Sequence, residues 1–134
     1  MMQEGLAALL EADAGVNAIA AGRIFCIQAP PQGEVYPCLV YKCVGGEGAA
    51  IFEDGAGPIR QRVEITALSD NGAEAMRLRY AATIALKQWR HQKLPDGTYI
   101  DTCNLLNPGL DIEPGVTRYF SCMCEFYVFF NMPI

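Results

Sequence analysis

The side chains best suited to catalysis or metal binding in this sequence are six cysteines and one histidine. The cysteines stand at positions 26, 38, 43, 103, 122 and 124, and the histidine is His91. A zinc site would need close cysteine or histidine pairs such as C-x₂-C, which the sequence lacks. A Cys–His nucleophile pair would have to use His91, which ends a basic segment that we expect to be exposed. We therefore expect no metal site and no catalytic residue, and we interpret the cysteines as small buried apolar side chains.

The spacing of the cysteines limits the disulfides that they can form. Cys122 and Cys124 are two residues apart in a predicted strand, so they point to the same face but lie too far apart for an unstrained bond. Cys38 and Cys43 are five apart in another predicted strand and fall on opposite faces. The sequence leaves open whether any of the six forms a disulfide.

The glycine-rich segment 45–58 is the other candidate for chemistry, with five of the thirteen glycines. It lacks the Lys-Ser/Thr pair that completes a phosphate-binding P-loop, and no G-x-G-x-x-G motif opens a helix, so we expect no cofactor. A loop this long is uncommon in a small domain unless it has a function. Two large apolar residues, Ile51 and Phe52, stand among its small ones, and they either fold back on the core or contact another protein.

Composition and charge exclude some classes of protein. The chain has 134 residues, of which 51% are hydrophobic and 19% charged, and this suits one domain. A net charge of −5 argues against a protein that binds phosphate over its whole surface. The charge is −5 over residues 1–59, +4 over 60–93 and −4 over 94–134. This division indicates either complementary faces for self-association or merely solvated surface. With no targeting signal or membrane span, we expect a soluble protein made in a cytoplasm.

Periodicity and turn residues predict the elements that position these residues. Helices are expected at 2–13 and 16–20, the second ending at Gly22, and a main helix is expected from a capping box at Asn71 and Glu74 to near His91. Strands are expected at 23–27, 38–44, 59–67, 98–105 (ended by the break Asn107-Pro108-Gly109) and from 120 onward.

The main helix and the last strand show the clearest patterns. One face of the helix carries Ala73, Met76, Tyr80, Thr83, Ile84 and Lys87, with Ala81, Ala85 and Trp89 nearby and Arg77 and Arg79 flanking the apolar stripe. In the strand, every even position from Phe120 to Phe130 is apolar, which predicts one buried face. Together these patterns predict an α+β fold, in which an antiparallel sheet carries one main helix packed across it and a short N-terminal helical segment. We expect one domain, 1–134, with a long flexible loop at 45–58.

The charged and apolar residues of the middle of the chain are the candidates for protein contacts. Arg60 and Arg62 share a strand face with Glu64, and no aromatic residues interleave with them in the sequence, so a partner's acidic surface suits them better than nucleic acid. The candidate interface residues are Glu47, Ile51, Phe52, Glu53, Asp54, Arg60, Arg62, Arg77 and Arg79.

The order of short motifs resembles a known family. A short Leu/Ala helix is followed by Gly22-Arg23-Ile24-Phe25, by the proline-broken segment 29–33 and by Tyr36-Pro37-Cys38-Leu39-Val40-Tyr41. A strand at 62–67, a Gly-Ala-Glu-Ala helix start at 71–75 and an aromatic alternating last strand come later. Over nearly its whole length the chain resembles the tail-completion (tail-terminator) family of tailed bacteriophages.

The resemblance implies a non-enzymatic structural protein of the virion. Such a protomer assembles in the host cytoplasm into a ring, commonly a hexamer, that caps the tail tube at its head-proximal end. The implied partners are further copies of itself, the tail tube protein and a neck or connector protein. DNA passes through the lumen without specific binding, which suits the acidic net charge. No cofactor and no membrane are implied.

The resemblance implies that Arg23 and Pro37 have a structural role. It also implies that the 45–58 loop is the variable extension that contacts neighbouring subunits. Two alternatives stay open: a neck or head-to-tail connector ring, and a small cysteine-dependent or metal-binding protein.

Overall fold

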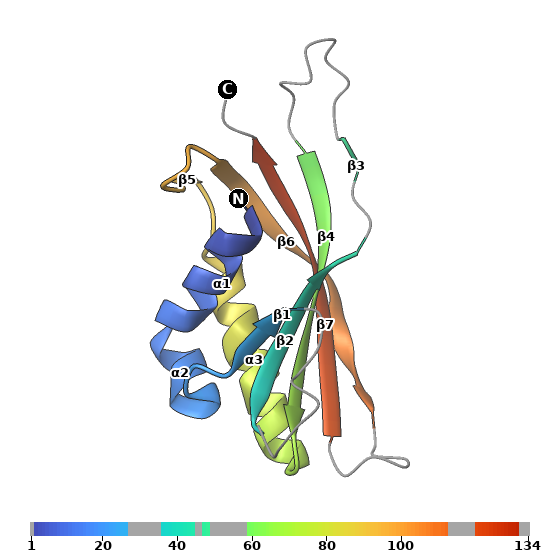
Figure 1. Cartoon of the computed structure of the whole chain (residues 1–134). Coiled ribbons are helices and arrows are strands. Elements are labelled where there is room, and N and C mark those ends of the chain that lie inside the picture. The colour runs from blue at the N-terminus through green and yellow to red at the C-terminus, as the bar shows by residue number, and fades with distance from the viewer. Residues whose placement is uncertain (1, 27–35, 45–46, 49–58, 113–119, 132–134) are drawn as a thin grey trace.

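A computed structural model describes residues 2–26, 36–44, 47–48, 59–112 and 120–131 of the chain. The helices are α1 (Met2–Ala12), α2 (Ala14–Ala20) and α3 (Gly72–Lys87). The strands are β1 (Ile24–Cys26), β2 (Cys38–Cys43), β3 (Glu47–Gly48), β4 (Ile59–Ser69), β5 (Gln92–Lys93), β6 (Tyr99–Ile112) and β7 (Phe120–Asn131). All three helices lie against one face of a single twisted sheet (Figure 1). The predicted α+β fold is confirmed.

The sheet has the strand order β1-β2-β4-β7-β6-β5, with β3 pairing separately with β4. It is antiparallel except at one edge, where β1 runs parallel to β2, so the sheet is mixed rather than wholly antiparallel as predicted. Side chain and backbone tie this edge together: Arg23 Nε donates to the carbonyl oxygen of Pro37 at 2.7 Å, and Leu39 N donates to the carbonyl oxygen of Arg23 at 3.0 Å. Arg23 and Pro37, for which the family resemblance implies a structural role, are therefore in direct contact.

The predicted break at Asn107-Pro108-Gly109 is wrong, because β6 continues through it to Ile112. The pairing with β7 absorbs these residues through register shifts between Leu105 and Asn107 and between Asn107 and Leu110. Beyond Tyr99 and Ile100, β6 pairs with only one other strand among the described residues. An edge strand tolerates proline because the N–H that proline lacks is not needed on its open side.

The core lies between the sheet and the helices. On β7 the even positions Cys122, Cys124, Phe126, Val128 and Phe130 are buried, while the odd positions are half-buried. The prediction of one buried face is thus confirmed. The helices contribute Leu6 and Leu10 from α1, Val16 and Ala20 from α2, and Leu78 and Leu86 from α3.

All six cysteines are free, and Cys38, Cys103, Cys122 and Cys124 are buried, as predicted. The other two differ from the prediction, because Cys43 is half-buried and Cys26 is exposed on the edge strand β1. Cys38 packs with Val40 and Leu68 in a small cluster, whereas Cys43 contacts the main core, so the two do lie on opposite faces of β2.

A cap at Asn71 begins α3. Its side-chain oxygen accepts hydrogen bonds from Ala73 N at 3.0 Å and Glu74 N at 3.3 Å. The other half of a capping box differs from the prediction. Glu74 accepts a hydrogen bond from Ser69 Oγ at 2.8 Å, and Ser69 Oγ accepts one from Asn71 N at 3.0 Å. Ser69 therefore satisfies the N–H that the glutamate satisfies in a standard box.

Replacing Asn71 by alanine is expected to lower the free energy of unfolding by about 1 kcal/mol, because two helix N–H groups lose their acceptor. Urea denaturation followed by circular dichroism measures the change. Asn71→Asp keeps an acceptor oxygen and serves as the matched control, which should stay close to the unmodified protein. Equal losses in the two variants would contradict this account of the cap.

The side of α3 that faces the sheet is not the stripe that the sequence indicates. The buried residues are Ala75, Leu78, Ala82, Ala85 and Leu86, and the helix ends at Lys87 rather than near His91. Met76, Tyr80 and Ile84 are instead 47%, 67% and 41% exposed. The three buried alanines allow the helix backbone to approach the sheet closely, so the larger side chains of the stripe point outward.

Candidate assembly surfaces

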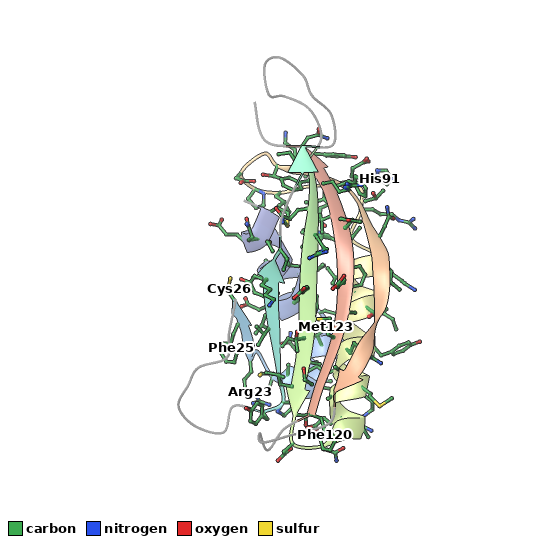
Figure 2. All side chains as sticks on the ribbon, turned by 90° about the vertical axis from the view of Figure 1, so that its right-hand side faces the viewer. Arg23, Phe25, Cys26, His91, Phe120 and Met123 are labelled. Atoms are coloured by element: carbon green, nitrogen blue, oxygen red, sulfur yellow. The ribbon has the colours of Figure 1, made fainter. Side chains whose placement is uncertain are left out.

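The four arginines predicted as interface residues fall in two separate places. Arg60 and Arg62 lie on β4 and belong to the sheet face opposite the helices, which Figure 2 turns toward the viewer. Arg77 and Arg79 lie on α3, on the other side of the sheet. The sequence therefore identified basic residues of two surfaces rather than of one patch.

The acidic and loop candidates are described only in part. Glu47 lies in β3, and its backbone pairs opposite Arg60, so the 45–58 segment contributes a short strand at this end of the sheet. Ile51, Phe52, Glu53 and Asp54 lie outside the described residues.

Aromatic side chains surround the arginines on the open face. Phe129 of β7 lies opposite Arg60 of β4, and Tyr127 lies opposite Arg62. The guanidinium carbon of Arg60 is 4.6 Å from the centre of the Tyr127 ring, which is a cation–π contact. The Tyr127 and Phe129 rings meet edge to face at 6.4 Å. The absence of aromatic neighbours inferred from the sequence is therefore wrong, because strand pairing brings them from another part of the chain.

Arg62 has a buried Nε atom with no hydrogen-bond partner among the described residues. A buried N–H without an acceptor costs roughly 1–3 kcal/mol. Because the atom is already closed off from solvent within the protomer, a group on another chain could not reach it without a rearrangement of Arg62.

Carboxylates occupy the middle of the same face. Glu64 of β4 lies opposite Glu125 of β7, and Lys42 of β2 approaches the Glu64 carboxylate at 3.3 Å. Like charges on directly opposed residues destabilise a sheet, and Lys42 offsets part of this repulsion. Further along the face lies the apolar cluster of Cys38, Val40 and Leu68, in the rows that pair with Met123 and Ser121 of β7. The open face thus changes from cationic and aromatic to acidic to apolar.

The outward side of α3 forms the second surface. We define the α3 stripe as Met76, Tyr80 and Ile84 together with the exposed Arg77 and Lys87. The one acidic residue of this helix, Glu74, is hydrogen-bonded to Ser69. The α3 stripe is therefore apolar and basic.

The histidine and the buried thiols have surroundings that do not suit catalysis. His91 is exposed, with Nδ1 3.4 Å from the Tyr99 hydroxyl. Burial raises the pKa of the Cys103 thiol to about 12, and the neighbouring Cys124 adds to the rise. Burial also raises the pKa of Cys38 to about 11, against a smaller lowering by Arg23. A nucleophilic cysteine needs the opposite shift.

Two further properties concern the described part of the chain alone. Within it, His, Cys, Asp and Glu side chains form no group of three or more that could hold a metal ion. None of the helices α1 to α3 is long and apolar enough to cross a membrane.

Comparison with known proteins shows the family of the chain. Its sequence matches the family described as "Tail completion protein gp17" over residues 4–130. The chain belongs to this family. The resemblance found in the sequence is thereby confirmed, and the chain is a tail-completion structural protein of a virion.

Solved structures show a related fold. A chain of the structure described as "Virion of native gene transfer agent (GTA) particle" superposes on the tail completion protein with a TM-score of 0.68 at 14% identity. The match covers 95% of this chain and 92% of that chain. At this identity the likeness establishes the fold alone. No curated protein matches the sequence.

Proposed function

We propose that this tail completion protein forms a ring, with six copies as the expected number, that caps the phage tail tube at its head-proximal end. The ring also offers the surface that joins the tail to the head, and it assembles in the host cytoplasm. The observation that carries the proposal is the family match over residues 4–130. The two unlike surfaces of the protomer support it, because a ring contact joins one patch to a different patch on the next copy.

The open sheet face is the proposed contact with the tail tube protein or the neck protein. Arg60 is held in place by the Tyr127 ring, and Arg62 lies on the same face of β4, opposite Tyr127. Half-buried Phe129 adds apolar area beside them. A partner with carboxylates or backbone carbonyls at its surface fits this chemistry. DNA is proposed to pass through the lumen without specific binding.

Loss of the protein in an otherwise complete virion assembly system tests the proposal. A terminator stops tube polymerisation, so its absence should give tail tubes longer than normal, measured by electron microscopy. Absence of a neck connector, the alternative within the same machinery, should instead leave tails of normal length unattached to heads. Tails of normal length would therefore overturn the terminator role.

The double variant Ile51→Asp with Phe52→Asp is expected to leave the protomer folded and to prevent its contact with the ring or the tube. The physical reason is that two carboxylates replace the large apolar side chains of the 45–58 segment. Light scattering gives the oligomer mass, and microscopy gives the tail length. The matched control is Ala49→Asp with Ala50→Asp in the same segment, which adds the same charge and removes no large apolar side chain. Unchanged mass and tail length in the first variant would contradict the prediction.

A further inference from the structure

The described part of the sheet has an open edge on each side. β1 is the last strand on one side and pairs only with β2 among the described residues. On the other side, β5 covers only Tyr99 and Ile100 of the much longer β6. Figure 2 shows β1, in blue, and β6, in orange, on opposite sides of the open face. An open edge presents backbone N–H and C=O groups that can pair with another chain.

The hydrogen bonds of the sheet determine which backbone groups of β6 point to its open edge. Along an antiparallel strand, successive residues direct their N–H and C=O groups to alternate sides. The carbonyl oxygen of Arg62 in β4 accepts a hydrogen bond from the chain at the end of β2 at 2.8 Å. Tyr127 of β7, opposite Arg62, therefore bonds to the other side, where its partner is Asn104 of β6. The neighbours Cys103 and Leu105 direct their N–H and C=O groups to the open edge.

The outward groups of β1 follow from the same alternation. The carbonyl oxygen of Arg23 accepts a hydrogen bond from β2 at 3.0 Å, so Arg23 and Phe25 direct their backbone groups to β2. Ile24 and Cys26 direct theirs outward. The N–H of Ile24 donates to the carbonyl oxygen of Gly22 at 3.0 Å. The open edge of β1 therefore presents the C=O of Ile24 and both backbone groups of Cys26.

The two edges match in direction and in the placement of their side chains. β1 is parallel to β2, and each pairing from β2 through β4 and β7 to β6 is antiparallel, so β1 and β6 run in opposite directions. A copy related by rotation about an axis along the strands presents its β1 antiparallel to β6. Cys103, Leu105 and Ile24 contact the main core on the helix side, and Cys26 lies opposite Tyr41 of that core. Directly opposed residues share a face of a sheet, as these do.

We propose that β1 of one copy adds to the open edge of β6 in the next copy, so that the sheet continues around the ring. The pairs are Cys26 with Cys103, Phe25 with Asn104 and Ile24 with Leu105. A shift of two residues one way would use Asp101, whose carbonyl oxygen already accepts a hydrogen bond from His91 N at 3.1 Å. A shift the other way would use Asn107, where the register with β7 changes. The contact rests on the proposed ring and names the strands that build it.

The α3 stripe supports this pairing. α3 contacts β6, whereas α1 contacts β1 and α2 contacts β2, so the joined edge brings the helices of the next copy beside α3. Within one copy, α2 covers the side of α3 that carries Ala81, which lies 3.9 Å from a Cβ atom added at Gly15. Met76, Tyr80 and Ile84 stay exposed. A symmetric pair of two β6 edges would instead bring two basic α3 stripes together and would close at two copies.

Engineered cysteines test the register. In the proposed contact, Phe25 and Asn104 form a non-hydrogen-bonded pair with Cα atoms about 4.5 Å apart, within the range of a disulfide. Within one copy they are four strand spacings apart, about 19 Å, so only a link between copies can form. Phe25→Cys with Asn104→Cys, oxidised by diamide, which takes up the two thiol hydrogens, should give a ladder of cross-linked copies up to the ring on non-reducing gels.

The matched control moves one cysteine by two residues. Phe25→Cys with Thr102→Cys places the Cα atoms about 7–8 Å apart and should cross-link roughly ten times more slowly, because this distance exceeds the disulfide range. Phe25→Cys alone measures any cross-linking by the native cysteines. Equal rates for the two pairs, or a product that stops at two copies, would overturn the inference.

A proline on β6 tests the edge itself. Leu105→Pro removes an N–H that points to the open edge and leaves the pairing with β7 intact. Leu105→Ala loses the same side chain but keeps the N–H and is the matched control. Circular dichroism should show that both fold, and sedimentation velocity should show rings only for Leu105→Ala. Rings formed by Leu105→Pro would contradict the pairing. If the unmodified protein never assembles, even with tail tube protein present, the proposed function itself fails, which distinguishes the two failures.

Discussion

Replacing Phe126 by alanine is expected to lower the free energy of unfolding by about 3–5 kcal/mol. The Phe126 side chain has no exposed surface and lies on β7, which is paired with β4 on one side and β6 on the other. Its cross-strand neighbours are Val63 and Leu105. Because strands on both sides are hydrogen-bonded to β7, the backbone cannot close the cavity that the truncation leaves.

A matched control comes from the same strand. Phe129→Ala removes the same ring from the open face, where the side chain is half-buried, and should cost about 1 kcal/mol or less. Urea denaturation of both variants under the same conditions gives the comparison. Similar losses for Phe126 and Phe129 would show that the even positions of β7 do not form the core face.

This contrast also explains which parts of the fold were predictable. The alternation in β7 is a local pattern with one solution, since a shift of one residue would expose Cys122, Cys124 and Phe126 together. The cap at Asn71 is equally local. The sequence of α3 allowed two orientations of the helix, since either of two faces could have packed against the sheet. One face carries Met76, Tyr80 and Ile84 and the other carries mainly alanine and leucine, so hydrophobicity alone favoured the wrong one.

Long-range pairing accounts for the remaining differences. The signal for a turn at Pro108 and Gly109 is overridden because β6 pairs with β7 on both sides of these residues, up to Asn107 and again from Leu110, and register shifts absorb them. Tyr127 and Phe129 reach Arg60 and Arg62 only through the register of β4 and β7, which lie far apart in the sequence. The packing of α1 depends in the same way on the close approach of Gly5 to Leu94. Rules for turns and periodicity describe only a few neighbouring residues. The sequence therefore identified the arginines as candidate interface residues but could not show which surfaces they form.

The protein is expected to lose stability steeply above pH 9 because of its buried thiols. Burial raises the pKa of Cys38 to about 11 and that of Cys103 to about 12, from an ordinary value of 9.0. Burial also raises the pKa values of Cys43, Cys124 and Tyr41. Between pH 9 and the raised values, the unfolded chain releases protons that the folded chain keeps. The stabilising contribution is therefore fully present below pH 9 and lost as the pH rises.

For Cys38 and Cys103 together, the free energy of unfolding should fall by about 2 kcal/mol between pH 9 and pH 10, since each pKa unit corresponds to about 1.4 kcal/mol. Urea denaturation across this range, under reducing conditions, measures the slope. The double variant Cys38→Ala with Cys103→Ala should show a shallower slope, with the remainder due to the other buried groups. A thiol that served as a nucleophile would behave in the opposite way. Its pKa would be depressed, and its stabilising contribution would be lost on acidification. A protein whose stability is unchanged up to pH 10 would contradict the burial of these thiols.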